Sequence, residues 1–156
     1  MINLLFWLRS QLLICIIEGV KPIVKLFYHP DPWPLNLPSL RQFPVGSLGR
    51  EVAQYLDDRQ FDLLSHYETH DIKHVLLEYE MTAEGEVRMQ CFLLGNGNTF
   101  ISVLGTVAVG LLLMPELWPT FYRDYQRGKN AVNVSRLDFA WIIYQKPADL
   151  RKKLSL

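Results

Sequence analysis

Residues 69–94 read THDIKHVLLEYEMTAEGEVRMQCFLL, and this stretch decides the fold class. Its first half predicts a helix over residues 69–81, because at about 100° per residue its apolar side chains fall on one arc. The break at residues 82–85 interrupts this helix, and a second helix is predicted over residues 83–94. We expect the apolar arc to face a core, and its members are Ile72, Val75, Leu76 and Tyr79.

The opposite arc of the first predicted helix carries side chains that suit a ligand. A face made for solvent would more typically carry lysine and glutamate. This arc instead holds Tyr67, His70, Asp71, His74 and Glu78. The helix is therefore predicted to turn one face to the core and the other to a bound group.

A candidate metal site combines this arc with the next helix. Its ligands are His70, Asp71, His74 and Glu86, the last in the first turn of the second helix. Two neutral imidazoles and two carboxylates match a divalent cation in charge and in ligand type. Without a cation, carboxylates packed beside one another would repel. The alternative is that the two histidines are ordinary polar residues of an exposed helix.

Two other metal-dependent classes use similar residues. The zinc proteases have His-Glu-x-x-His, in which the acid is a general base. Here the acid is Asp71, whose shorter side chain reaches a metal more naturally than a substrate water. A helical phosphohydrolase with a His-Asp doublet needs a further upstream histidine and a downstream aspartate, for which His29 and Asp124 are the candidates. The phosphohydrolase stays open as an alternative.

Residues 1–28 are predicted to form an apolar or amphipathic N-terminal helix. Met1–Ile17 is rich in Leu, Ile, Phe and Trp, but Arg9 lies in its middle. A transmembrane helix needs about 20 apolar residues, and a signal peptide carries its basic residues before the apolar stretch. The helix either packs on the domain or lies in a membrane interface, and both possibilities stay open.

The remaining chain predicts helices and no sheet, so the fold class is all-α. Residues 29–44 hold five of the nine prolines and are expected to form an extended connection. Residues 45–156 are expected to form the helical metal-site region, with all segments in one compact domain. Within it, Phe100–Met114 is uncharged and is predicted to be the buried central helix. Further helices are predicted over residues 49–56 with Ser47 as N-cap, from Pro115 to a C-cap at Gly128, over residues 138–145 and over residues 148–154.

The charge and the cysteines set limits on partners and compartment. The chain has 16 acidic and 16 basic residues, a net charge of zero, which argues against nucleic acid as a partner. Cys15 and Cys91 lie in apolar runs and are predicted to be reduced core cysteines.

The metal motif resembles the signature of the ubiquinone (coenzyme Q) biosynthesis COQ-four family. The resemblance rests on His70-Asp71-x-x-His74, eleven intervening residues and Glu86. Residues 46–50, Gly-Ser-Leu-Gly-Arg, are similar to that family's helix start, and residues 147–154 are similar to its C-terminal ending. The chain is most similar to a compact bacterial-type member.

This resemblance implies a metal-dependent lyase. The four ligands would bind a divalent cation, zinc first, with manganese, iron or magnesium as alternatives. The substrate would be a polyprenylated hydroxybenzoate, whose ring carboxylate is removed with or without replacement by hydroxyl. The protein would be cytoplasmic and peripheral to the inner face of the membrane, or on the matrix side in mitochondria, with other quinone-biosynthesis proteins as partners.

Two further side chains are candidates for catalytic roles. Glu78 could transfer a proton, and the alternative is a solvent carboxylate that pairs with a lysine. Tyr67 could orient a ligand, and the alternative is a core tyrosine. A rival function is a non-catalytic prenyl-lipid-binding or scaffold protein of quinone biosynthesis, because the sequence has no obvious redox motif or catalytic nucleophile.

Overall fold

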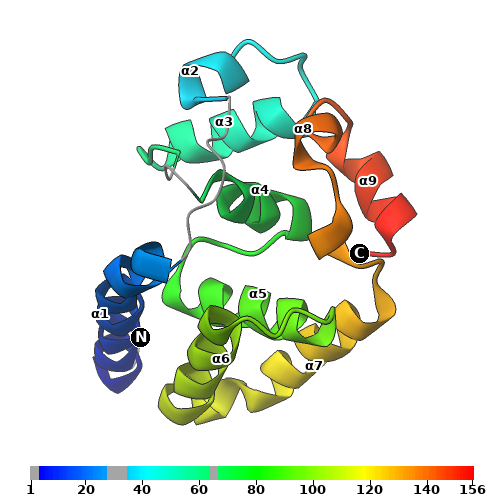
Figure 1. The fold of residues 1–156 in the computed structure, drawn as a ribbon. Coiled ribbons are helices and arrows are strands. Elements are labelled where there is room, and N and C mark those ends of the chain that lie inside the picture. The colour runs from blue at the N-terminus through cyan, green and yellow to red at the C-terminus, as the bar shows by residue number, and fades with distance from the viewer. Residues whose placement is uncertain (1–3, 28–34, 64–66) are drawn as a thin grey trace. The chain divides into compact units, whose positions relative to one another are not determined.

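The computed structural model describes residues 4–27, 35–63 and 67–156, and every regular element in those ranges is a helix (Figure 1). The prediction of an all-α fold is confirmed. The chain divides into two compact units. The first unit comprises Met1–His29 and Glu80–Val132, and the second unit comprises Pro30–Tyr79 and Asn133–Leu156. The expected division at residues 28 and 44 within one domain stays a prediction.

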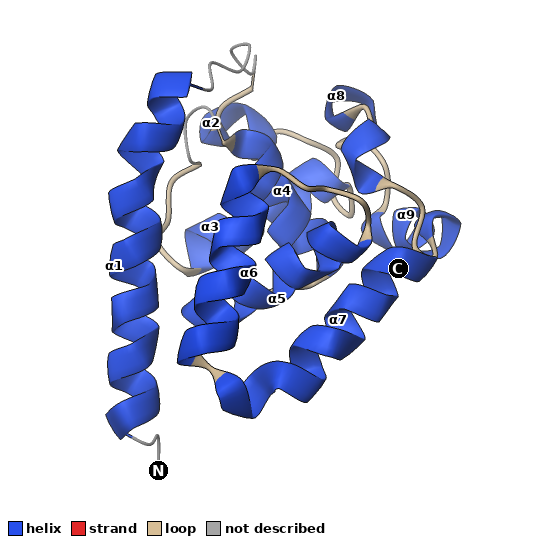
Figure 2. Ribbon diagram, turned by 60° about the horizontal axis from the view of Figure 1, so that its bottom comes forward, coloured by secondary structure: helices blue, strands red, loops and turns tan. Residues whose placement is uncertain are grey.

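The first unit is built around α5. Its elements are α1 (Leu4–Phe27), α5 (Ala83–Gly95), α6 (Ile101–Leu113), the 3₁₀ turn η1 (Pro115–Leu117) and α7 (Trp118–Asn130). Helix α5 packs against α7, α6 and α1, and α1 runs alongside α6 (Figure 2). Buried side chains from all four helices form one cluster: Leu13, Ala83, Val87, Cys91, Val107, Met114 and Phe121. The predicted N-terminal helix is confirmed in α1.

The prediction that residues 100–114 form the buried central helix is wrong. In α6 the buried residues are Val103, Val107 and Gly110, whereas Ile101 and Leu112 are each 79% exposed. The position in the middle of the unit belongs to α5, most of whose residues are buried. An apolar composition makes burial favourable, but the neighbours of a helix decide how much of its circumference is covered.

Glycines allow α5 and α7 to approach backbone to backbone. A Cβ on Gly95 would collide with the carbonyl oxygen of Tyr125, and a Cβ on Gly128 would collide with that of Phe92. Gly128 is therefore a contact residue inside α7. The prediction that it is the C-cap is wrong, because α7 continues to Asn130. The cysteine prediction holds for Cys91, which is buried, and is wrong for Cys15, which is exposed on α1.

The second unit holds the predicted metal-motif helix. Its elements are α2 (Leu37–Leu40), α3 (Leu48–Asp58), α4 (Glu68–Leu77), the 3₁₀ turn η2 (Val134–Arg136), α8 (Phe139–Ile142) and α9 (Pro147–Leu154). Helix α4 packs against α3 and α9 (Figure 1). Its predicted apolar face is confirmed, since Ile72, Val75 and Leu76 are buried.

Two boundaries in the second unit differ from the predictions. The proline-rich segment, of which residues 35–44 are described, is not wholly extended: Asn36 accepts the Ser39 backbone N–H and starts the short α2. Helix α4 ends at Leu77 instead of residue 81, because Glu78 adopts a left-handed backbone conformation with φ +62°. At the start of α3, Ser47 accepts the Arg50 backbone N–H and is the N-cap that the sequence predicted.

Taken singly, none of the helices in the described ranges has both the length and the apolar composition to cross a membrane. Two consecutive helical segments, Ile101–Leu113 and Pro115–Asn130, are together long and apolar enough to cross a membrane, but the chain bends by 105° between them.

Candidate functional site

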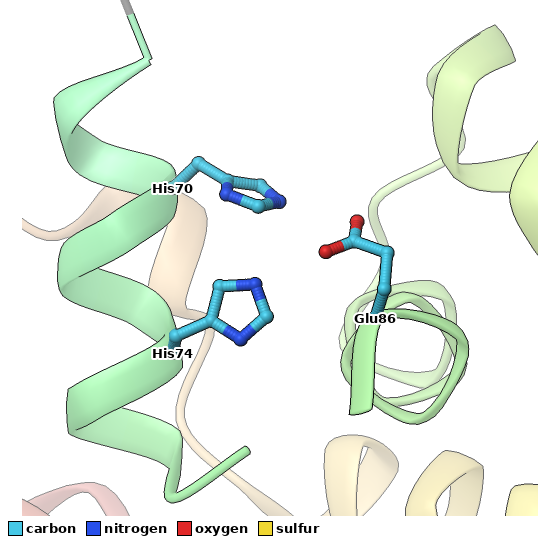
Figure 3. Close-up of side chains that lie close together, drawn as sticks. All are labelled: His70, His74 and Glu86. Atoms are coloured by element: carbon cyan, nitrogen blue, oxygen red, sulfur yellow. The ribbon is translucent and has the colours of Figure 1, made fainter. Parts of the chain in front are cut away.

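Helix α4 carries three of the predicted metal ligands in the second unit, and it brings the two histidines together. His70 and His74 leave the helix on the same side, one turn apart (Figure 3). Their ring centroids lie 4.7 Å apart, and the ring planes are inclined by 69°. One ring nitrogen of His70 and one of His74 lie within 4.8 Å of each other. Two nitrogens that each bind one ion at about 2.0–2.1 Å lie at most about 4.2 Å apart, so a shared ion requires no more than a small rotation of the rings.

The imidazole of His74 is held in one tautomer by the main chain. Its Nδ1 lies 3.1 Å from the carbonyl oxygen of Tyr79. A carbonyl oxygen only accepts, so Nδ1 carries the proton and donates the hydrogen bond. In the neutral ring, Nε2 then carries the lone pair. Histidine ligands to metals commonly donate their second N–H to a carbonyl in this way.

The turn after α4 brings the Tyr79 carbonyl to His74. The backbone N–H groups of Glu78 and Tyr79 both donate to the His74 carbonyl oxygen, the latter at 2.9 Å. This requires the left-handed conformation of Glu78, which non-glycine residues adopt infrequently. Main-chain geometry at residue 78 therefore positions a ring at residue 74.

The side chain of Glu78 does not continue the ligand face of α4, because the helix ends before it. It is 62% exposed, and its Oε1 lies 3.3 Å from Nη1 of Arg151. The alternative to a proton-transfer role was a solvent-exposed carboxylate paired with a lysine. The observed contact resembles this alternative, but the partner is an arginine. The proton-transfer role of Glu78 stays a prediction.

Asp71 and Tyr67 flank the two histidines along the chain. The Asp71 side chain is 8% exposed, and its Oδ1 lies 3.6 Å from Nδ1 of His70. Tyr67 stands at the N-cap position of α4, and its hydroxyl oxygen is buried. The ligand-orienting role of Tyr67 stays a prediction.

Glu86 belongs to the first unit, where it lies in the first turn of α5 (Figure 3). The helix starts here because the Thr82 side chain accepts the Gly85 backbone N–H at 3.1 Å. The Glu86 Oε1 accepts a hydrogen bond from Nε2 of Gln90 at 2.8 Å, which orients the carboxylate. The placement of Glu86 in a first helical turn is confirmed, and its joining the three α4 residues at one metal stays a prediction.

Sequence reasoning missed three groups around these side chains: Gln90, the Tyr79 carbonyl and Arg151. Gln90 follows Glu86 by four residues, and this helical spacing was a usable signal. The other two depend on where α4 ends, and the glutamate at residue 78 is not a turn residue that marks an end.

Of the two residues that a phosphohydrolase would need in addition, the described part of the chain includes one. His29 lies outside the described residues. Asp124 is buried on α7 of the first unit and accepts a hydrogen bond from Nε of Arg88 at 2.9 Å. Burial and, to a smaller extent, the Asp124 charge raise the pKa of the nearby Cys91 thiol to about 12. Asp124 thus forms a structural ion pair in the first unit.

Comparison with known proteins gives the fold and the family. The crystal structure of a Nostoc punctiforme PCC 73102 protein, whose name suggests a role in ubiquinone biosynthesis, has a TM-score of 0.63 to this chain at 21% sequence identity. The similarity covers 94% of this chain and 80% of that one, and at this identity it shows the fold alone. No match is found among curated proteins. The profile of the family described as coenzyme Q (ubiquinone) biosynthesis protein Coq4 matches residues 49–156. The chain therefore belongs to the Coq4 family, and its role lies in ubiquinone biosynthesis.

Proposed function

We propose that the protein is a metal-dependent enzyme of ubiquinone biosynthesis that removes the ring carboxylate from a polyprenylated hydroxybenzoate-type intermediate. The cation would be held by His70, Asp71, His74 and Glu86. The observation that carries this proposal is the hydrogen bond from Nδ1 of His74 to the Tyr79 carbonyl, because it leaves Nε2 as the metal-binding nitrogen.

The donor chemistry fits a divalent cation. Two neutral imidazoles and two carboxylates give a site of zero net charge once the ion is bound. The imidazole nitrogens favour zinc or iron over magnesium, which prefers oxygen ligands. Zinc is the proposed ion. The low exposure of Asp71 also fits, since a buried carboxylate needs a compensating charge.

The residues divide the work of decarboxylation as follows. A cation held by His70, Asp71, His74 and Glu86 would supply a Lewis acid for the substrate carboxylate or phenolate and would stabilise negative charge on the ring. The bond between the ring carbon and the carboxylate breaks, carbon dioxide leaves, and the electron pair stays on the ring carbon. A proton then replaces the carboxylate, and Glu78 is the proposed donor, with Tyr67 orienting the ring. Replacement by hydroxyl requires an oxidant such as dioxygen, so assays with and without air distinguish the two products.

The first test is elemental analysis of the purified protein beside its variants. We expect about one metal ion per chain, lost in Asp71→Ala, His74→Ala and Glu86→Ala while helical circular dichroism persists. The matched control is Glu84→Ala, which removes another carboxylate from the first turn of α5. A metal content that is equal in all four variants would contradict the proposed site.

A prenyl-lipid-binding or scaffold role is the second candidate. Exposed apolar side chains on α1, such as Leu4, Leu8 and Leu12, favour contact with a lipid or a membrane surface. An assay with a prenylated hydroxybenzoate distinguishes the two functions. If the protein is the enzyme, carbon dioxide release should be proportional to the metal content. A metal-loaded protein that retains the lipid and never releases carbon dioxide would instead support the scaffold role.

A further inference from the structure

The guanidinium of Arg151, on α9, binds the C-terminal end of α4. Its Nε donates to the Leu76 carbonyl oxygen at 3.0 Å, and its Nη2 donates to the Val75 carbonyl oxygen at 2.8 Å. Its Nη1 lies 3.3 Å from Oε1 of Glu78. Three nitrogens of one side chain therefore hold one helix end.

These contacts fall where α4 needs partners. The last four carbonyl groups of a helix have no partner within the helix. The His74 carbonyl accepts hydrogen bonds from the backbone N–H groups that follow the helix. The next two carbonyl groups, those of Val75 and Leu76, accept hydrogen bonds from Arg151. A cation at this end also interacts favourably with the helix dipole.

The same turn carries the proposed metal ligand His74. Its ring orientation depends on the Tyr79 carbonyl, and that carbonyl is placed by the turn through Glu78. We propose that Arg151 is a positioning residue for the metal site: by fixing the last turn of α4, it holds the His74 imidazole in its metal-binding orientation. This inference rests on the proposed function, because it assumes that His74 binds a metal.

The arrangement requires an arginine. The guanidinium presents several N–H groups in a rigid fork, whereas a lysine offers one compact ammonium group. Lysine at residue 151 keeps the charge but cannot reproduce the two directed hydrogen bonds at 2.8 and 3.0 Å. The Glu78 carboxylate is 62% exposed, so its ion pair with Arg151 contributes little.

The experiment is a titration of the metal-free protein with Co²⁺, followed by visible absorption. Arg151→Ala is expected to weaken Co²⁺ binding about tenfold and to shift the absorption bands, since residues that orient metal ligands commonly contribute 10–100-fold to affinity. Lys152→Ala, an exposed cation on the same helix, is the matched control and keeps the wild-type affinity. Low concentrations of guanidinium ion should restore the affinity of Arg151→Ala, and urea should not.

The outcomes separate this inference from the proposed function. If the wild-type protein binds no Co²⁺, the metal site itself is refuted. If it binds Co²⁺ and Arg151→Ala matches its dissociation constant and spectrum, only the positioning role is overturned. Should Arg151→Ala fail to fold, Arg151→Lys decides, because a several-fold loss of affinity supports the role and an unchanged affinity overturns it.

Discussion

The two cysteines have opposite environments and should react differently. Cys15 is exposed, whereas Cys91 is 3% exposed and has a pKa raised to about 12 by burial and by Asp124. At pH 9.0, the ordinary pKa of a thiol, we expect Ellman's reagent to modify Cys15 rapidly and Cys91 only after unfolding. The raised pKa keeps Cys91 in its thiol form in the folded chain, and unfolding restores its ordinary ionisation. In Cys15→Ser the fast phase should vanish, and a remaining fast phase would show that Cys91 is accessible.

At the scale of single residues, the candidate metal ligands of α4 could be picked out because they lie on local helical spacing. His70, Asp71 and His74 needed only the period of one helix to be placed on one side. The groups that orient them could not be predicted. The Tyr79 carbonyl reaches His74 through a positive φ at Glu78, and a glutamate gives no local signal for that conformation.

Helix α7 crosses α5 through glycine, and this contact predicts a large effect of one methyl group. Gly128→Ala should destabilise the protein by about 1–3 kcal/mol, because its Cβ would collide with the Phe92 backbone. The matched control is Gly105→Ala on α6, where nothing lies within 4 Å of the new Cβ. That change should stabilise the protein by up to about 1 kcal/mol through helix propensity. Urea denaturation of both variants checks the pair, and equal stabilities would contradict the close crossing.

At the scale of elements, the starts of α3 and α5 were predictable, whereas the end of α4 was not. Ser47 and Thr82 cap their helices with their own side chains, three residues from the N–H groups that they accept, so the signal is local. The end of α4 lies at the left-handed Glu78, and its last carbonyl groups accept hydrogen bonds from Arg151, a residue of another helix far along the chain. For the same reason, Gly128 suggested a C-cap although its function is contact with α5.

The proposed metal should stabilise the whole molecule. A ligand that binds the folded chain alone, present at about 100 times its dissociation constant, adds about 2.7 kcal/mol to the free energy of unfolding. We therefore expect zinc to raise the melting temperature and chelation to lower it again. His74→Ala is the control, and its melting temperature should not respond to zinc. An equal response of both proteins would locate the zinc elsewhere.

The apolar face of α1 predicts association with membranes. Leu5, Leu8 and Leu12 recur at helical spacing and are 57%, 50% and 50% exposed. Replacing all three with serine should reduce flotation with phosphatidylglycerol-containing vesicles roughly tenfold or more, since burying each leucine contributes about 1.5–3 kcal/mol. Val45→Ser removes another exposed apolar side chain, 90% exposed in the second unit, and should leave flotation unchanged. Full flotation of the triple variant would exclude this face as the membrane contact.

For the whole molecule, the sequence predicted the all-α class but misplaced the most buried helix. The run at residues 100–114 is more apolar than α5, yet α6 has two residues that are 79% exposed. The apolar composition of a helix determines how unfavourable its exposure to water is. How much of it is buried depends on which helices pack against it. In the first unit those neighbours surround α5.

The capping of α4 by Arg151 also affects the order in which the protein matures. The two carbonyl groups that Arg151 binds precede it by 75 and 76 residues. At about 5–20 residues per second, a ribosome takes about 4–15 s to add that length of chain. During this interval the nascent histidines are already made, but the guanidinium that fixes their helix is not. If the proposed metal site needs this cap, the nascent chain should bind the proposed cation only after α9 has been synthesised.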